Sequence, residues 1–187
     1  GTRDNHRRLY RWHFRGAVIR SVSSLIMWLS CLAAYLLNFI HPRNFVSDTL
    51  AVAYLILLNP PVLWVIKRIR RRRTAALFGL FINFLEIVGY TAVIYSFGGI
   101  EAAYLLPIYA ALIIYVGIAG PRILPFIIAG LCSIAFGAML TLEHLGVLPP
   151  MKINPAYHVP WTAQLAILGV VTLLLFIVAF VSSHTAH

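Results

Sequence analysis

The chain has 187 residues, of which 61% are hydrophobic and only 11% are charged, and its formal net charge is +10. Soluble proteins have about 45–50% apolar and about 25% charged residues, so this composition excludes an ordinary soluble globular domain. Most basic residues lie in two blocks, 3–15 and 67–73, each beside an apolar stretch. Basic residues in that position orient membrane helices and attract anionic headgroups, which favours the lipid bilayer as a partner and argues against nucleic acid.

Six apolar stretches are long enough to cross a bilayer as helices, each of which needs about 20 residues. They show no period-2 alternation, and lipid admits only helices or closed barrels, so helices are predicted. The expected fold class is therefore an all-α membrane protein, a bundle of six transmembrane helices. The predicted spans are 16–40, 47–66, 74–97, 102–119, 122–143 and 161–183.

The distribution of charge predicts the orientation of these spans. An inside N-terminus places residues 1–15, 67–73 and Arg122 on one side, so both termini are expected in the cytoplasm. Residues 1–15 would then form a basic cytoplasmic segment and 16–184 the six-helix domain, with 145–160 as an outer loop. The acidic residues Asp48, Glu101 and Glu143 fall in or beside the outer loops.

The first two spans are joined by HPRNFVSD, residues 41–48, and the second contains Asn59-Pro60-Pro61. Two prolines remove backbone donors and kink a helix. The kink could be a hinge or the wall of a pocket, or it could be static, and the sequence leaves these alternatives open.

Glu86 is the one carboxylate in the middle of the third span. Helical spacing places it on one face with Gly79, Asn83 and Tyr90, and this polar face must point into protein. No Lys or Arg lies at a comparable depth in any predicted helix. Because burial disfavours the charged form, we expect a neutral carboxylic acid that donates a hydrogen bond, with Asn83 and Tyr90 as partners.

Three roles are open for Glu86. It could join helices through a hydrogen bond, it could bind a ligand or couple a signal, or it could carry protons or ions.

The third and fourth spans are joined by a turn at Gly98–Gly99, where positive φ angles are expected. The fourth span contains Tyr104, Tyr109 and Tyr115, and Pro107 predicts a bend in it. Aromatic rings with hydroxyl tips suit a pocket for a small hydrophobic or amphipathic ligand, although they also suit ordinary packing.

The chemical motifs of enzymes are missing from the sequence. It has no phosphate-binding G-x-x-x-x-G-K-[ST], no H-E-x-x-H and no G-x-S-x-G, so we predict no catalytic residue and no cofactor. The histidines lack metal-ligand spacing, so no metal site is predicted.

Three stretches carry a resemblance to a known family: SFGGIEAAYLLPIYAALIIYVGIAGPR over the third and fourth spans, MLTLEHLGVLPP closing the fifth, and LAILGVVTLLLFIVAFVSS in the last. With the basic N-terminal stretch, this order of parts resembles the multi-pass membrane sensor module of bacterial sensor histidine kinases.

That resemblance implies a sensory domain in the bacterial inner membrane, working as a homodimer. The last helix would relay a stimulus to a cytoplasmic kinase region absent from this chain, and through it to a response regulator. The family carries over no residue roles; from the residues themselves, we expect the sensing residues to be Glu86, Asn83, Tyr90, Asn59, Pro60, Tyr104 and Tyr109. The alternative reading is a small proton-coupled transporter or channel subunit that uses Glu86.

Overall fold

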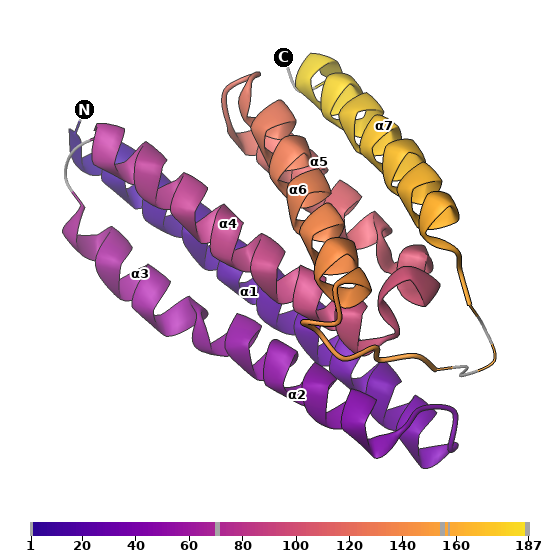
Figure 1. Cartoon of the computed structure of the whole chain (residues 1–187). Coiled ribbons are helices and arrows are strands. Elements are labelled where there is room, and N and C mark those ends of the chain that lie inside the picture. Colours follow the sequence, from indigo (N-terminus) through magenta and orange to yellow (C-terminus); the bar gives the residue numbers. More distant parts are fainter. Residues whose placement is uncertain (1, 70–71, 154–155, 157, 186–187) are drawn as a thin grey trace. The chain divides into compact units, whose positions relative to one another are not determined.

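The computed structural model describes residues 2–69, 72–153, 156 and 158–185, with side chains from Phe14 onward except at 72–73 and 119. Within these ranges the chain is helical apart from turns and one loop, and contains no β-strand (Figure 1). The all-helical class is therefore confirmed. The elements are α1 Thr2–Leu36, α2 Pro42–Leu57, α3 Asn59–Arg68, α4 Arg72–Ser96, the 3₁₀ helix η1 Gly99–Leu105, α5 Pro107–Ala119, α6 Leu124–His144 and α7 Trp161–Thr185.

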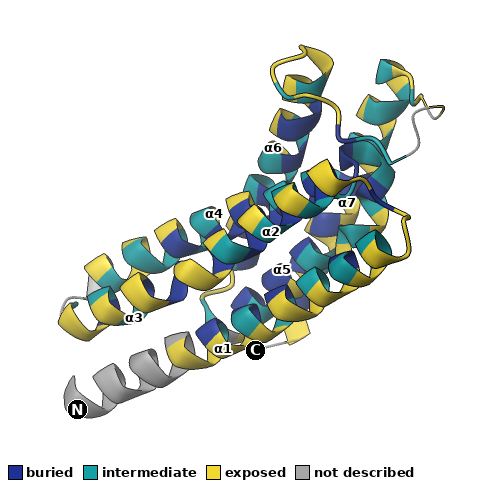
Figure 2. Ribbon diagram, turned by 90° about the horizontal axis from the view of Figure 1, so that it is seen from below, coloured by how far each residue is buried: buried dark blue, intermediate teal, exposed yellow. Residues whose placement is uncertain are grey.

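Five stretches of the described chain are long and apolar enough to cross a membrane. A sixth is added if η1 and α5, which bend by 49° at Pro107, count as one span. Only 22–39% of the residues in the apolar part of the five spans are buried, and Figure 2 colours the exposed residues along the helices yellow. Many of these exposed residues are large and apolar, such as Leu29, Leu77 and Ile134. Water-soluble proteins rarely expose apolar surface on this scale, which fits a multi-pass membrane protein.

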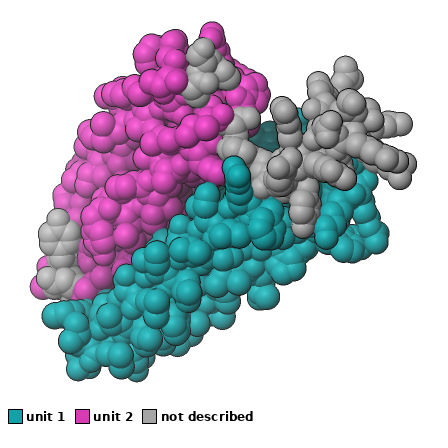
Figure 3. Space-filling model, turned by 180° about the vertical axis from the view of Figure 1, so that it is seen from behind, with its two compact units in different colours: residues 1–89 teal, residues 90–187 magenta. Residues whose placement is uncertain are grey.

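The chain divides into two compact units, residues 1–89 and 90–187, which Figure 3 colours separately. The first unit contains α1, α2, α3 and most of α4. In it, α1 and the α2–α3 pair lie side by side (Figure 1). The turn between α1 and α2 is closed by Asn38, whose φ of 60° is left-handed, a conformation that asparagine tolerates at a helix C-terminus.

Aromatic side chains set the register of α1 on α2. The Trp28 indole Nε1 donates a hydrogen bond of 3.0 Å to Thr49 Oγ1. About two turns further along α1, the ring of Tyr35 stacks on Phe45 with centroids 4.8 Å apart. These contacts hold the two helices close over the part of the hairpin next to the turn.

The first two helices begin earlier than the sequence predicted. Helix α1 begins at Thr2 rather than at residue 16, so the basic segment forms the first part of this helix. Helix α2 begins at Pro42, because proline fits the first turn of a helix, where no backbone donor is needed. The prediction that residues 41–48 form a connecting loop was therefore wrong, and Asp48 lies inside α2, fully buried, rather than beside a loop.

At the predicted kink the structure has a one-residue interruption between α2 and α3, Leu58, which keeps right-handed helical angles and donates a hydrogen bond to Tyr54 O. Pro60 and Pro61 follow it in the first turn of α3, and they provide no N–H to the carbonyls four residues earlier. Leu58 and Val62 pack with Ile82 of α4 in a buried apolar cluster. The kink therefore lies where α3 meets α4.

In the second unit α5, α6 and α7 pack against one another. The predicted turn is confirmed, since Gly98 and Gly99 have φ angles of 107° and 59°. Two hydrogen bonds tie the loop after α6 to this turn region: the Tyr95 hydroxyl donates to Pro149 O at 2.5 Å, and Ile153 N donates to Glu101 Oε2 at 3.1 Å. Residues 154–155 and 157 of the predicted loop at 145–160 lie outside the described residues.

Candidate functional site

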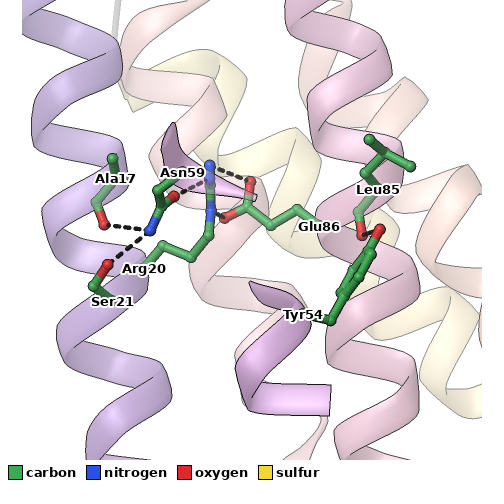
Figure 4. A network of polar contacts seen from close by, with 7 residues as sticks. All are labelled: Ala17, Arg20, Ser21, Tyr54, Asn59, Leu85 and Glu86. Carbon is green, nitrogen blue, oxygen red and sulfur yellow. Dashed lines mark hydrogen bonds and ion pairs between the residues drawn. The ribbon is translucent and has the colours of Figure 1, made fainter. Parts of the chain in front are cut away.

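A buried ion pair joins α1 to α4. Arg20 Nε donates to Glu86 Oε1 at 2.8 Å, and Arg20 Nη2 donates to Glu86 Oε2 at 3.1 Å (Figure 4). Only 6% of Arg20 and 7% of Glu86 is exposed. The planar guanidinium thus meets both carboxylate oxygens, a bidentate geometry that Lys cannot provide.

Asn59, the first residue of α3, completes this pair. Its Oδ1 accepts a hydrogen bond of 2.6 Å from Arg20 Nη1. Its Nδ2 donates to Ser21 Oγ at 2.7 Å and to Ala17 O at 3.3 Å, both on α1 (Figure 4). The amide therefore uses its acceptor and both of its donor hydrogens, and it is itself buried.

The local structure explains why these side chains meet. The break at Leu58 starts a new helix at Asn59, next to the two prolines. On α1, Ala17, Arg20 and Ser21 share one face through spacings of three and four residues, and this face turns to Asn59. On α4, Ile82 and Glu86 share the buried face through the same spacing. We refer to Arg20, Ser21, Asn59 and Glu86 as the polar network.

The prediction of a neutral, hydrogen-donating Glu86 was wrong. It depended on the statement that no cation lies at the depth of Glu86, whereas the structure pairs Glu86 with Arg20. Arg20 lies about 8 Å beyond Arg15 on the same helix, inside the first apolar run. An Arg inside an apolar run was the signal in the sequence.

The energetics of the network do not favour a simple role in stability. Removing two charges from water costs several kcal/mol per ion, and their attraction offsets this only with good geometry and further hydrogen bonds. The bidentate pair and Asn59 supply both, so the network is satisfied but is not an efficient way to stabilise helices. Charged groups inside a membrane protein are candidates for function on these grounds.

The other predicted site residues of the first unit lie near this network. Asn83, one turn before Glu86 on α4, is half-buried, and Pro60, directly after Asn59, is exposed. Of the predicted site residues, the structure therefore brings together Glu86 and Asn59, and it adds Arg20 and Ser21, which the sequence analysis missed.

The remaining predicted site residues belong to the second unit. Tyr90 is buried, and Tyr109 is fully buried with its hydroxyl 2.5 Å from that of Thr91. Tyr104 is exposed and lies in η1 rather than in α5. A ligand-binding role for these tyrosines stays a prediction.

No group of three or more His, Cys, Asp or Glu side chains in the described part of the chain is arranged to hold a metal ion. His144, at the end of α6, stacks on Trp161, with ring centroids 4.2 Å apart.

Comparison with known proteins gives no relative. No protein-family model, curated protein or solved structure matches this chain.

Proposed function

We propose that this chain is the membrane-embedded input domain of a sensor histidine kinase, in which the polar network couples a stimulus to helix position. The observation that carries the proposal is the buried Arg20–Glu86 pair, held by Asn59 at the break between α2 and α3. The network ties three helices together at the point where one of them is interrupted.

The position of Asn59 makes this junction a hinge in the proposal. Pro60 and Pro61 lack the N–H groups that would bond back into α2, so α2 and α3 are joined by fewer backbone hydrogen bonds than a regular helix has, among them Leu58 N to Tyr54 O and Val62 N to Leu58 O. The hydrogen bonds of Asn59 to α1 then fix the start of α3. A ligand that binds more tightly to an arrangement in which the hydrogen bonds of Asn59 to α1 are broken would shift the population toward that arrangement.

The rest of the proposal concerns orientation and output. The six spans would form one bundle with both termini in the cytoplasm, in the inner membrane of a bacterium, as a homodimer. The stimulus would be a small hydrophobic or amphipathic ligand or a property of the membrane. Helix α7 would pass the change to a cytoplasmic kinase region and so to a response regulator. This output is proposed from the resemblance of the sequence to the membrane sensor module of bacterial sensor histidine kinases.

The experiment begins with the reading frame beyond the codon for His187. A phospho-accepting helix followed by an ATP-binding domain would support the proposal. Autophosphorylation of the full-length protein in liposomes would then be compared between the wild type, Glu86→Gln and Arg20→Lys, with Asn83→Gln as a control on the same helix. We expect altered autophosphorylation in Glu86→Gln and Arg20→Lys, and no change in the control Asn83→Gln. Unchanged kinase activity in folded Glu86→Gln and Arg20→Lys would overturn the role of the network.

The geometry favours this reading over proton-coupled transport through Glu86. A carboxylate held by two hydrogen bonds from a guanidinium is stabilised in its charged form. A proton carrier at Glu86 would have to separate from Arg20 in every cycle. Proton flux in liposomes that Glu86→Gln abolishes would restore the transport reading.

A further inference from the structure

The second carboxylate in the described part of the first unit, Asp48, has surroundings opposite to those of Glu86. It lies on α2, two turns from Pro42, and none of it is exposed. Neither of its oxygens has a hydrogen-bond partner among the described residues. An unpaired carboxylate in an apolar interior costs far more than a neutral carboxyl group, so burial without a partner favours the neutral form in this arrangement.

The groups that face Asp48 provide no compensating charge. The Trp28–Thr49 hydrogen bond places Asp48 level with the second half of α1, where the neutral Cys31 thiol lies beside it. Arg20 precedes Trp28 on α1 by about 12 Å along the helix axis, and it is bound to Glu86. On α2, His41 and Arg43 near the turn are exposed, and on α3 Lys67 and Arg68 lie at its far end.

We propose that Asp48 is a proton-binding site, and that release of its proton is coupled to separation of α1 from α2. In the packed arrangement the site holds a neutral carboxyl group. On release, the O–H bond breaks, the proton passes to water at the turn between α1 and α2, and a carboxylate stays on Asp48. That carboxylate needs water, which the packed helices exclude, so deprotonation and separation favour each other. The ligand is a proton, and the site does not depend on the proposed kinase output.

The protonation state is tested on the protein in liposomes, with Asp48 unchanged, by infrared spectroscopy with isotope-labelled aspartate. The sequence contains two aspartates, Asp4 and Asp48, so an Asp4→Asn background leaves Asp48 as the one labelled carboxyl. We expect an isotope-shifted band of a protonated carboxyl group at neutral pH. A spectrum with carboxylate bands alone would overturn the proposal and indicate a bound cation or water instead. This measurement needs no substitution at Asp48.

The coupling is tested through the native thiols. Cys31 beside Asp48 and Cys132 on α6 are both buried, so Cys132 serves as the internal control for the effect of pH on thiol chemistry. As pH rises, we expect maleimide labelling of Cys31 to increase several-fold more than that of Cys132. In Asp48→Asn this excess should disappear, whereas Glu101→Gln should retain it. Parallel labelling of the two thiols in the wild type would overturn the coupling.

Discussion

At the scale of single residues, the two buried carboxylates of the first unit show how surroundings decide charge. Glu86 receives two hydrogen bonds from Arg20, whereas both oxygens of Asp48 have no hydrogen-bond partner in the described chain. The same chemical group therefore has a cationic partner in one place and no hydrogen-bond partner in the other. The difference depends on the neighbouring helix, not on the residue type.

The Arg20–Glu86 pair gives the sharpest residue-scale prediction. Arg20→Met leaves Glu86 buried beside an apolar side chain, so it should lower the free energy of unfolding by about 3–5 kcal/mol. The double variant Arg20→Met with Glu86→Leu removes both charges and should recover most of this loss. Unfolding equilibria in bicelles would measure both values. A single variant as stable as the wild type would show that the pair does not form.

Asn59 and Asn83 form a matched pair, because the sequence assigned both to the same site. Asn59→Leu removes three hydrogen bonds and leaves Arg20 Nη1 unpaired, so it should cost about 2 kcal/mol of unfolding free energy. Asn83 is half-buried and outside these hydrogen bonds, so Asn83→Leu should cause no loss. The same unfolding assay compares them, and equal costs would contradict the assignment of Asn59 to the network.

At the scale of elements, two glycines on α4 differ in their surroundings: a neighbouring helix packs closely on Gly89 but not on Gly79. A Cβ on Gly89 would lie 2.4 Å from Leu55 Cδ2, and Leu55 is fully buried, whereas nothing lies within 4 Å of a Cβ on Gly79. Gly89→Ala should therefore destabilise the protein by about 1–3 kcal/mol through overpacking of α4 on α2. Gly79→Ala should stabilise it by up to about 1 kcal/mol. Thermal unfolding of both variants would distinguish them, and a stabilised Gly89→Ala would argue against this approach of the two helices.

At the scale of the whole molecule, the testable feature is orientation in the membrane. If the positive-inside rule holds, Arg43→Cys should react with an impermeant maleimide in intact cells. Lys67→Cys and Arg122→Cys should react only after permeabilisation. The native Cys31 and Cys132 are buried, which keeps background labelling low. Labelling of Arg43→Cys and Arg122→Cys from the same side would contradict the proposed topology.

The helices themselves could be predicted from the sequence because lipid leaves few alternatives. A run of about 20 apolar residues must satisfy its backbone hydrogen bonds internally, so helical class and approximate spans follow from composition and length. The turn at Gly98–Gly99 and the bend at Pro107 followed from local backbone chemistry in the same way. Helix starts were less predictable, since Pro42 and the basic segment before residue 16 both extend helices beyond the apolar runs.

The sequence by itself predicted that Glu86 faces protein, because lipid offers it no partner, and it assigned Asn59 to the same candidate site. Only the tertiary structure decided which partner each one has. Arg20, Asn59 and Glu86 are far apart in the chain, and their meeting depends on the register of three helices. The physical reason is that periodicity assigns a residue to a face of its own helix, whereas the level at which two helices meet is set by packing. That level gave Glu86 a cation and left Asp48 without one.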